Sequence, residues 1–228
     1  MTDQDRKLVS QIEATAAKVA SFIAEYNLTM NHEGISLHSR GRLYYADQSR
    51  YRVEGITNGQ RIITVSRNEV SQTFFIDQKM VSQSNSMENQ SPIDLLHGLS
   101  DIRDSFSSTD KETLVYVGKA HLDEQKVHHF KGHFPILPIP GNIRVRMPIE
   151  VDLFIDRASC LLLRRIWTQT GKGTLVNANY RIVEVNSSID DSYFSIDVSS
   201  PDIRKVDMMD ITNTLFFSDD KHTGASMN

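Results

Sequence analysis

The chain has 228 residues, 39% of them hydrophobic, which is enough apolar material for one domain with a sizeable core. Its formal net charge of -4, from 25 basic and 29 acidic residues, gives no reason to expect a nucleic-acid partner. No stretch approaches the roughly 18 consecutive apolar residues that a membrane-spanning helix needs.

The N-terminal segment has an amphipathic pattern that predicts a helix from Asp3 to Tyr26. Thr2 or Asp3 can cap its first turn. Apolar residues recur at steps of three and four, as in Leu8, Ile12, Ala16, Val19, Ile23 and Tyr26. We expect this helix to pack on a sheet. The same segment lacks the apolar core of a signal peptide, so the chain is either intracellular or a mature, exported form given a starting methionine.

A series of short strands is predicted next. Alternation between Leu28 and Asp47 indicates two strands that meet near Glu33-Gly34, with a further turn near residues 39–41. The later breaks carry turn-forming residues: Asp47-Gln48-Ser49, Asn58-Gly59, Arg67-Asn68 and Asp77-Gln78. This spacing is typical of an antiparallel meander.

A helix is predicted to begin at Ser91-Pro92, because serine is a good cap and proline suits the first helical position. Leu95, Leu96, Leu99 and Ile102 then follow at helical spacing. Five more strands are expected at Thr113–His121, Lys126–His133, Glu150–Asp156, Cys160–Gln169 and Thr174–Val185. The proline-rich residues 134–148 are interpreted as a long loop that acts as a lid or covers an edge. We expect one domain over residues 1–212 and a flexible tail over 213–228.

Few patterns in the chain suggest catalysis or metal binding. The histidines at 121, 128, 129 and 133 are poorly spaced for a metal, because His128 and His129 point to opposite faces of a strand. Residues 171–174, Gly-Lys-Gly-Thr, are interpreted as a hairpin turn, since a phosphate loop has a different spacing. Cys160 lies in an apolar run, which favours a buried structural thiol. Asp152 and Asp156 share one strand face, as expected of a polar outer surface. We therefore expect no catalysis, no cofactor and no metal.

The aromatic side chains allow two interpretations. They fill a packed core, or they line the inner face of a large curved sheet that side chains alone do not fill, leaving space for an apolar ligand. For the second interpretation we expect Tyr45, Tyr51, Phe74 and Leu153 to face inward. The candidate lining residues are Tyr44, Tyr45, Tyr51, Val53, Phe74, Ile76, Leu96, Leu153 and Ile155.

The order of these elements resembles the LolA/LolB-like superfamily of periplasmic lipoprotein carriers, including its uncharacterised periplasmic branches. The block GRLYYADQSRYRVEG matches the family segment G-x-L-x-x-x-R-P-x-x-[FY]-R at Gly41, Leu43, Tyr51 and Arg52. The segment SPIDLLHGL resembles the start of the family's lid helix. Asp190, Asp191 and Phe194 resemble its closing segment. The chain has Asp47-Gln48 where the family carries an Arg-Pro pair.

The resemblance implies an α+β fold, with one strongly curved, unclosed antiparallel sheet of ~10–12 strands and helices covering its concave face. It also implies non-catalytic binding or carriage of a lipid, an acyl chain or a lipoprotein in the bacterial periplasm, after removal of a signal peptide. Partners would be the lipid or lipidated protein and proteins of the inner or outer membrane, not nucleic acid. The alternative is a module of the same fold that senses envelope stress, lipid or polysaccharide.

Overall fold

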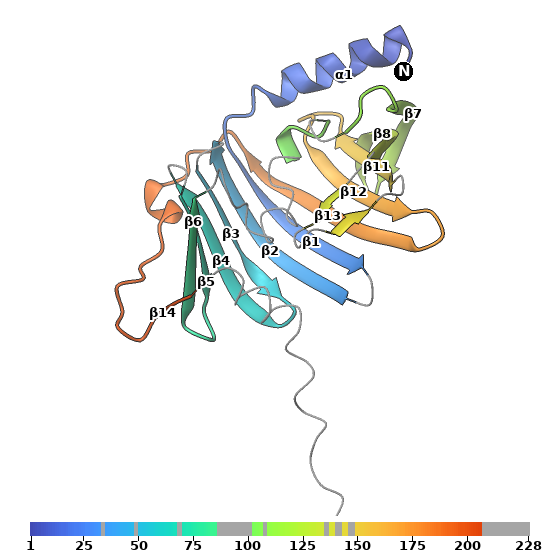
Figure 1. Ribbon diagram of the computed structural model, residues 1–228. Coiled ribbons are helices and arrows are strands. Elements are labelled where there is room, and N and C mark those ends of the chain that lie inside the picture. The colour runs from blue at the N-terminus through green and yellow to red at the C-terminus, as the bar shows by residue number, and fades with distance from the viewer. Residues whose placement is uncertain are drawn as a thin grey trace, which may run out of the picture.

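The computed structural model describes residues 1–32, 35–47, 50–67, 70–85, 102–106, 109–134, 137–139, 143–145 and 149–206. One curved sheet of twelve strands dominates it (Figure 1). The order across the sheet is β14-β6-β5-β4-β3-β2-β1-β13-β12-β11-β8-β7, and all neighbours are antiparallel except β14 and β6. The two edge strands, β14 and β7, do not pair with each other, so the sheet is unclosed as expected.

The first seven of these strands in chain order have the bounds β1 Phe22–His32, β2 Ile35–Asp47, β3 Arg50–Thr57, β4 Gln60–Arg67, β5 Val70–Phe75, β6 Met80–Asn85 and β7 Val115–Leu122. The others are β8 Gln125–Phe134, β11 Ile149–Asp156, β12 Leu162–Gln169, β13 Gly173–Val185 and β14 Arg204–Lys205. The meander and the five later strands are confirmed. The proline-rich segment contains a separate pair of short strands, β9 Leu137–Ile139 and β10 Ile143–Val145.

The N-terminal helix α1, Asp3–Ala16, begins as expected and ends earlier. Thr2 and Asp5 form a capping box, in which the Asp5 N–H donates to Thr2 Oγ1 at 3.1 Å. The expected continuation to Tyr26 is wrong, because β1 starts at Phe22. Residues 22–28 also fit a two-residue period. They form a strand instead of a helix because their backbone pairs with both β2 and β13.

The turns are partly as expected. Asn58 and Gly59 have φ of 46° and 81°, the geometry of a type I′ hairpin turn. Gly171 and Gly173, with φ of 80° and 89°, flank the turn between β12 and β13, which confirms the hairpin there. The turn expected at residues 39–41 is wrong, because β2 runs straight through Gly41, which pairs with Gly55 of β3.

We call the sheet face that carries the main apolar cluster the inner face, and the opposite one the outer face. The cluster extends from Val53 on β3 to Phe130 on β8. α1 joins it through Val9, Ile12 and Ala16 and lies across one end of the sheet (Figure 1).

The short segment Ile102–Phe106 lies over the inner face. Its Arg103 Cζ is 5.4 Å from the centroid of the Tyr45 ring on β2. Its Phe106 ring is 5.1 Å from that of Phe130 on β8, in an edge-to-face arrangement. Four strands separate β2 from β8 in the sheet. A five-residue segment that contacts both strands is consistent with a sheet that curves around it.

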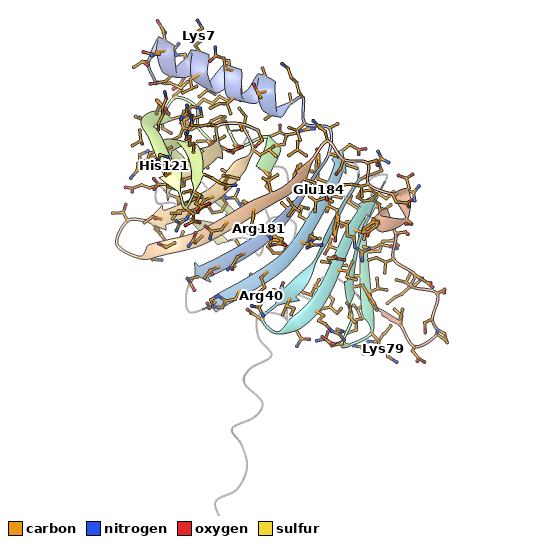
Figure 2. The ribbon with its side chains drawn as sticks, turned by 180° about the vertical axis from the view of Figure 1, so that it is seen from behind. Lys7, Arg40, Lys79, His121, Arg181 and Glu184 are labelled. Carbon is orange, nitrogen blue, oxygen red and sulfur yellow. The ribbon has the colours of Figure 1, made fainter. Side chains whose placement is uncertain are left out.

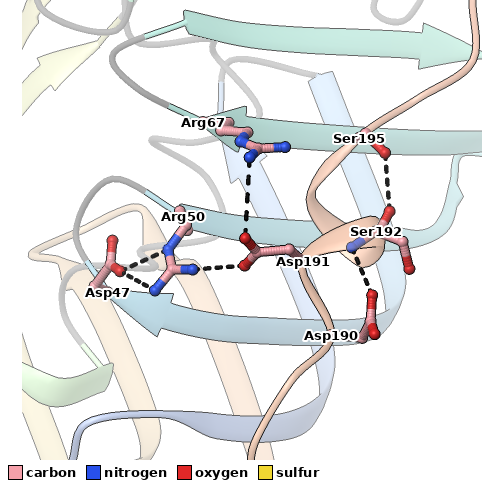
Figure 3. A network of polar contacts seen from close by, with 7 residues as sticks. All are labelled: Asp47, Arg50, Arg67, Asp190, Asp191, Ser192 and Ser195. Atoms are coloured by element: carbon pink, nitrogen blue, oxygen red, sulfur yellow. Dashed lines mark hydrogen bonds and ion pairs between the residues drawn. The ribbon is translucent and has the colours of Figure 1, made fainter.

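The segment after β13 packs on the outer face through a short 3-10 helix, η1 Asp191–Phe194. Arg50 forms ion pairs with Asp47 and Asp191, with nitrogen–oxygen distances of 2.8 and 2.7 Å. Arg67 forms a longer ion pair with Asp191, at 3.9 Å (Figure 3). The Ser192 N–H donates to Asp190, and the Ser195 hydroxyl donates to the Ser192 carbonyl. η1 is thereby attached to the ends of β3 and β4.

Three expectations fall on parts of the chain outside the described residues. These are the start of the helix at Ser91, residue Leu96 with its neighbours, and the tail over 213–228. Helices over the concave face are therefore not shown, and α1 packs at one end of the sheet. None of the described helices is long and apolar enough to cross a membrane.

Candidate functional site

The structure brings five of the expected lining residues together on the inner face. Tyr45, Val53, Leu153 and Ile155 are buried members of the main cluster, and Tyr51 packs against it half-buried. They come from β2, β3 and β11, which lie in different parts of the sheet. The inner face thus carries a continuous apolar cluster to which both halves of the chain contribute.

Three other candidates lie on the outer face. Tyr44 alternates with Tyr45 and packs against Phe194 of η1. Phe74, expected inward, is the register partner of Ile63, which packs on that same outer cluster. Ile76 lines an outer groove. The cause is strand parity: Tyr44-Tyr45 and Phe74-Phe75 are both adjacent aromatic pairs, so the pattern alone does not decide which member points inward.

The sequence pattern did not identify Arg165 as a site residue. Among the residues that the structure describes, it has the largest fully buried side chain, 2% exposed on the inner face of β12. Its register partners are Leu153 on β11 and Ala178 on β13, both apolar. Its Cζ lies 4.5 Å from the centroid of the Trp167 ring, a cation–π contact. Burial lowers the pKa of Arg165, and Tyr180 opposes that shift.

A signal for this residue was present in the sequence. Arg164 and Arg165 are adjacent in a strand that has neighbours on both sides. Because successive side chains point to opposite faces, one of the two must point inward whatever the register. Arg164 takes the outer position, where its Nε donates to Asn177 and its guanidinium lies over Phe154.

Two buried tyrosines form a pair on the inner face, and one of them, Tyr180, interacts electrostatically with Arg165. Tyr26 and Tyr180 are register partners on β1 and β13. Burial raises the pKa of Tyr26 to about 12 and also raises that of Tyr180. Both hydroxyls therefore stay protonated near neutral pH and can act as donors. The Tyr26 hydroxyl lies 3.3 Å from Ser39 Oγ, which is 2.7 Å from Thr57 Oγ1.

The inner face is not apolar throughout. On β4 to β6 it carries small hydroxyl side chains, of which Thr64 and Thr73 lie 3.2 Å apart. The buried hydroxyl residues of these strands are Thr64, Ser66, Ser71, Thr73 and Ser82. An apolar region around Leu153 and a hydroxyl-bearing region on β4–β6 are thus joined on one surface, with Tyr26, Ser39 and Thr57 between them.

The outer face carries paired charges and shallow grooves. Glu25 accepts hydrogen bonds from Arg181 and Arg42, and these contacts lower its pKa. Figure 2 labels Arg181 and Arg40, whose strands β13 and β2 flank β1. Two open grooves, of about 410 and about 500 Å³, are lined by outer-face side chains such as Glu25 and Ile56 and by the backbone of Gly41 and Gly55.

The histidines form two separate contacts. His129 Nε2 lies 2.6 Å from Asp152 Oδ1 on the outer face, and its ring stacks on Phe154 with centroids 4.4 Å apart. His128 Nδ1 lies 3.1 Å from the Tyr116 hydroxyl. Among the residues that the structure describes, no three His, Cys, Asp or Glu side chains converge as a metal site would require.

Cys160 is buried against the main cluster, as expected. Burial raises the pKa of its thiol, with a smaller opposing effect from Thr15. A reactive cysteine requires the opposite shift, towards the thiolate. The arrangement fits a structural thiol.

The sequence matches no protein-family model and no curated protein. The structure is similar to an uncharacterized conserved protein from Thermus thermophilus, with a TM-score of 0.54 and 14% identity over 88% of this chain and 99% of that one. It is also similar to the lipoprotein LppX from Mycobacterium tuberculosis, with a TM-score of 0.50 and 14% identity over 83% and 99% of the two chains.

A third similar structure is the MucA/MucB complex of Pseudomonas aeruginosa, with a TM-score of 0.50 and 14% identity. It covers 84% of this chain and 61% of that one, so this chain corresponds to less than two thirds of its length. At such low identity these likenesses show the fold alone. The fold shared with them is a large, curved, unclosed antiparallel sheet, the architecture that the sequence resemblance implied.

Proposed function

We propose that this protein binds or carries a lipid, an acyl chain or a lipidated protein in the bacterial envelope, as a periplasmic protein without catalytic activity. The ligand would lie on the inner face, against Tyr45, Tyr51, Val53, Leu153 and Ile155. Similarity of fold to the lipoprotein LppX supports this proposal.

The observation that carries the proposal is the continuous apolar cluster on the inner face of an unclosed sheet. Val53 and Leu153 are each at most 2% exposed and belong to the same cluster, although they lie on strands from opposite halves of the chain. Each CH₂ of a chain buried on such a surface contributes about 0.8 kcal/mol. A sheet whose edge strands do not pair with each other can widen to admit that chain. A closed barrel cannot widen without breaking hydrogen bonds between strands.

Binding requires the ligand to displace side chains that already cover this surface. Ile102 and Phe106 are buried in the same cluster as the lining residues. We interpret the segment that contains them as part of a lid. The affinity for a ligand is then the gain from burying its chain less the cost of lifting the lid.

Direct ligand binding tests the proposal. Protein produced in bacteria and purified under native conditions should carry lipid detectable by native mass spectrometry, and it should bind a fluorescent fatty acid. The variant Tyr51→Asn should bind that probe about tenfold more weakly, because an inner-face ring is lost. The matched control is Ile56→Asn, since Ile56 is 39% exposed on the outer face of the same strand. Absence of any bound lipid or probe, or equal loss in both variants, would contradict the proposal.

A second candidate is a sensing module that passes ligand binding on to a partner protein. The similarity to the MucA/MucB complex favours it, because that structure pairs a similar fold with a partner chain. The two functions differ in one measurable respect: a sensor would bind a membrane-protein partner with an affinity that changes when the lipid is loaded. A carrier would release its ligand to an acceptor instead.

A further inference from the structure

The two open grooves of the outer face form one depression that crosses β1 to β4, which we call the outer depression. They share four lining residues, namely Glu25, Gly41, Gly55 and Ile56. Towards β4 the lining is apolar, with Ile56, Ile63 and Ile76. Towards β1 and β2 it carries Arg40 and Arg42. The outer depression therefore offers an apolar half and a basic half to one occupant.

The basic half has more positive than negative charge. Glu25 lies between Arg42 and Arg181 and accepts a hydrogen bond from each. Arg40 adds a third cation on the neighbouring strand. On β3, Glu54 forms its own ion pair with an arginine of the same strand. In a chain with a formal net charge of -4, this local excess of arginine favours an acidic occupant.

The described part of the chain ends at Val206, at the edge of the sheet. The Val206 N–H donates to the Val81 carbonyl of β6 at 2.9 Å. Lys79, which Figure 2 labels, lies at the same edge, and its carbonyl accepts from the Arg204 N–H. Three strand spacings, about 15 Å in all, separate β6 from β3. Residues 207–214 span up to about 26 Å when extended, so the segment that follows them reaches the outer depression.

The sequence of that segment matches the outer depression in its order. Leu215, Phe216 and Phe217 are followed by Asp219 and Asp220. A segment that comes from β6 passes the isoleucines of the apolar half first and the arginines of the basic half second. In an extended chain Leu215, Phe217 and Asp219 point to the same side. Apolar residues would thus meet apolar lining, and the carboxylate would meet the arginines.

We infer that residues 215–220 of this chain bind the outer depression. Leu215 and Phe217 pack against its isoleucines, and Asp219 forms an ion pair with the arginines of β2. The contact lies on the face opposite the proposed ligand, so it goes beyond the proposed function and does not depend on it. A partner protein with the same order of apolar and acidic residues would bind this face only after displacing the segment.

A paramagnetic label on the full chain tests the contact. A nitroxide attached to Ser218→Cys should remove the backbone amide signals of Ile56 and Asn27, which line the outer depression. Cys160 is buried and should stay unlabelled. The reference is Tyr193, which is 46% exposed on η1 and lies outside the outer depression, although η1 contacts β3 and β4. Its signal should keep more of its intensity. Intact signals at Ile56 and Asn27, or equal losses at all three residues, would overturn the inference.

Two substitutions in the labelled chain probe the two halves of the contact. Phe217→Ser removes an apolar anchor and Arg40→Glu reverses a charge of the basic half, so each should restore the lost signals. Arg67→Glu is the matched control, because Arg67 contacts Asp191 on the outer face of β4 and lies outside the outer depression. It should leave the signal loss unchanged. Persistent loss in Phe217→Ser or in Arg40→Glu would overturn the inference.

A mixed sample separates a contact within one chain from a contact between copies. Isotope-labelled protein without the nitroxide is mixed with unlabelled protein that carries it on Ser218→Cys. Intact signals at Ile56 in this mixture would support binding of the segment to its own chain. Loss of these signals would mean that the segment binds a second copy, which would overturn the inference.

Discussion

The absence of side chains at Gly41 and Gly55 determines how closely two strands approach and where Tyr26 lies on the inner face. They pair with each other across β2 and β3. A Cβ on Gly41 would lie 2.0 Å from the Glu54 carbonyl oxygen, and one on Gly55 would lie 2.6 Å from the Tyr26 hydroxyl. The glycine pair thus allows two strands to approach closely and lets Tyr26 extend across them towards Ser39.

We predict that Gly55→Ala destabilises the protein by about 1–3 kcal/mol or more, because the added methyl overlaps both backbone and side-chain atoms. Urea unfolding followed by tryptophan fluorescence measures the change. Gly59→Ala is the control: its Cβ would meet nothing within 4 Å, so it should cost only the conformational strain of a positive φ, about 1 kcal/mol. A cost for Gly55→Ala no larger than that of Gly59→Ala would contradict the steric explanation.

For single residues, the sequence predicted that an apolar side chain is buried more reliably than it predicted the face of the sheet on which that side chain lies. Leu153 and Ile155 alternate with charged Asp152 and Asp156, so their inward direction follows from the pattern. Phe74-Phe75 has no such contrast, and only the register with Ile63 and Ile62 settles that Phe75 is the inner residue. Arg165 was overlooked because charged residues are ordinarily assigned to the surface.

Among the elements, η1 is attached to the outer face by the buried ring of Phe194 and by two ion pairs of Asp191. Phe194 is 1% exposed and packs with Tyr44 and Val65. The ion pairs of Asp191 with Arg50 and Arg67 join side chains that are 35% to 62% exposed and therefore screened by solvent. Apolar burial should therefore contribute far more to the attachment than the charges do.

We predict that Phe194→Ala lowers the free energy of unfolding by about 3–5 kcal/mol, or releases η1 locally if detachment costs less than that. Hydrogen exchange distinguishes global destabilisation from local release of η1, because local release would remove the protection of backbone amides in residues 189–196 alone. Asp191→Asn should leave both stability and protection nearly unchanged, since exposed ion pairs contribute little. A larger effect of Asp191→Asn than of Phe194→Ala would reverse this ranking.

The elements were predictable where pattern and turn chemistry agree. The hairpin at Asn58-Gly59 follows from residues that accept positive φ. The boundary between α1 and β1 was not predictable, because residues 19–26 fit both a helical and a two-residue period. Pairing of β1 with β13, more than 140 residues away in the chain, decides it, and such a contact leaves no local signal.

At the scale of the whole molecule, the sheet joins the two halves of the chain through β1 and β13. This contact places the apolar residues of β11 and the aromatic residues of β2 on one curved surface. The sequence order therefore indicated the class of fold, whereas the combination of Arg165, Tyr180 and Tyr26 depends on strand order and register. For the same reason, the polar part of the site was absent from the candidates chosen by sequence.

The proposed lid segment Ile102–Phe106 and the ligand would compete for the same apolar surface of the inner face. Phe106 is 1% exposed and packs on Phe130, so Phe106→Ala weakens the cover of the inner face. If the ligand displaces this segment, a weaker cover raises the fraction of binding-competent protein, and the affinity for a fluorescent fatty acid should rise about tenfold. Phe194→Ala is a matched control, because it removes an equally buried phenylalanine from the outer face. It should lower stability and leave the affinity unchanged. Weaker binding by Phe106→Ala would mean instead that Phe106 contacts the ligand and does not compete with it.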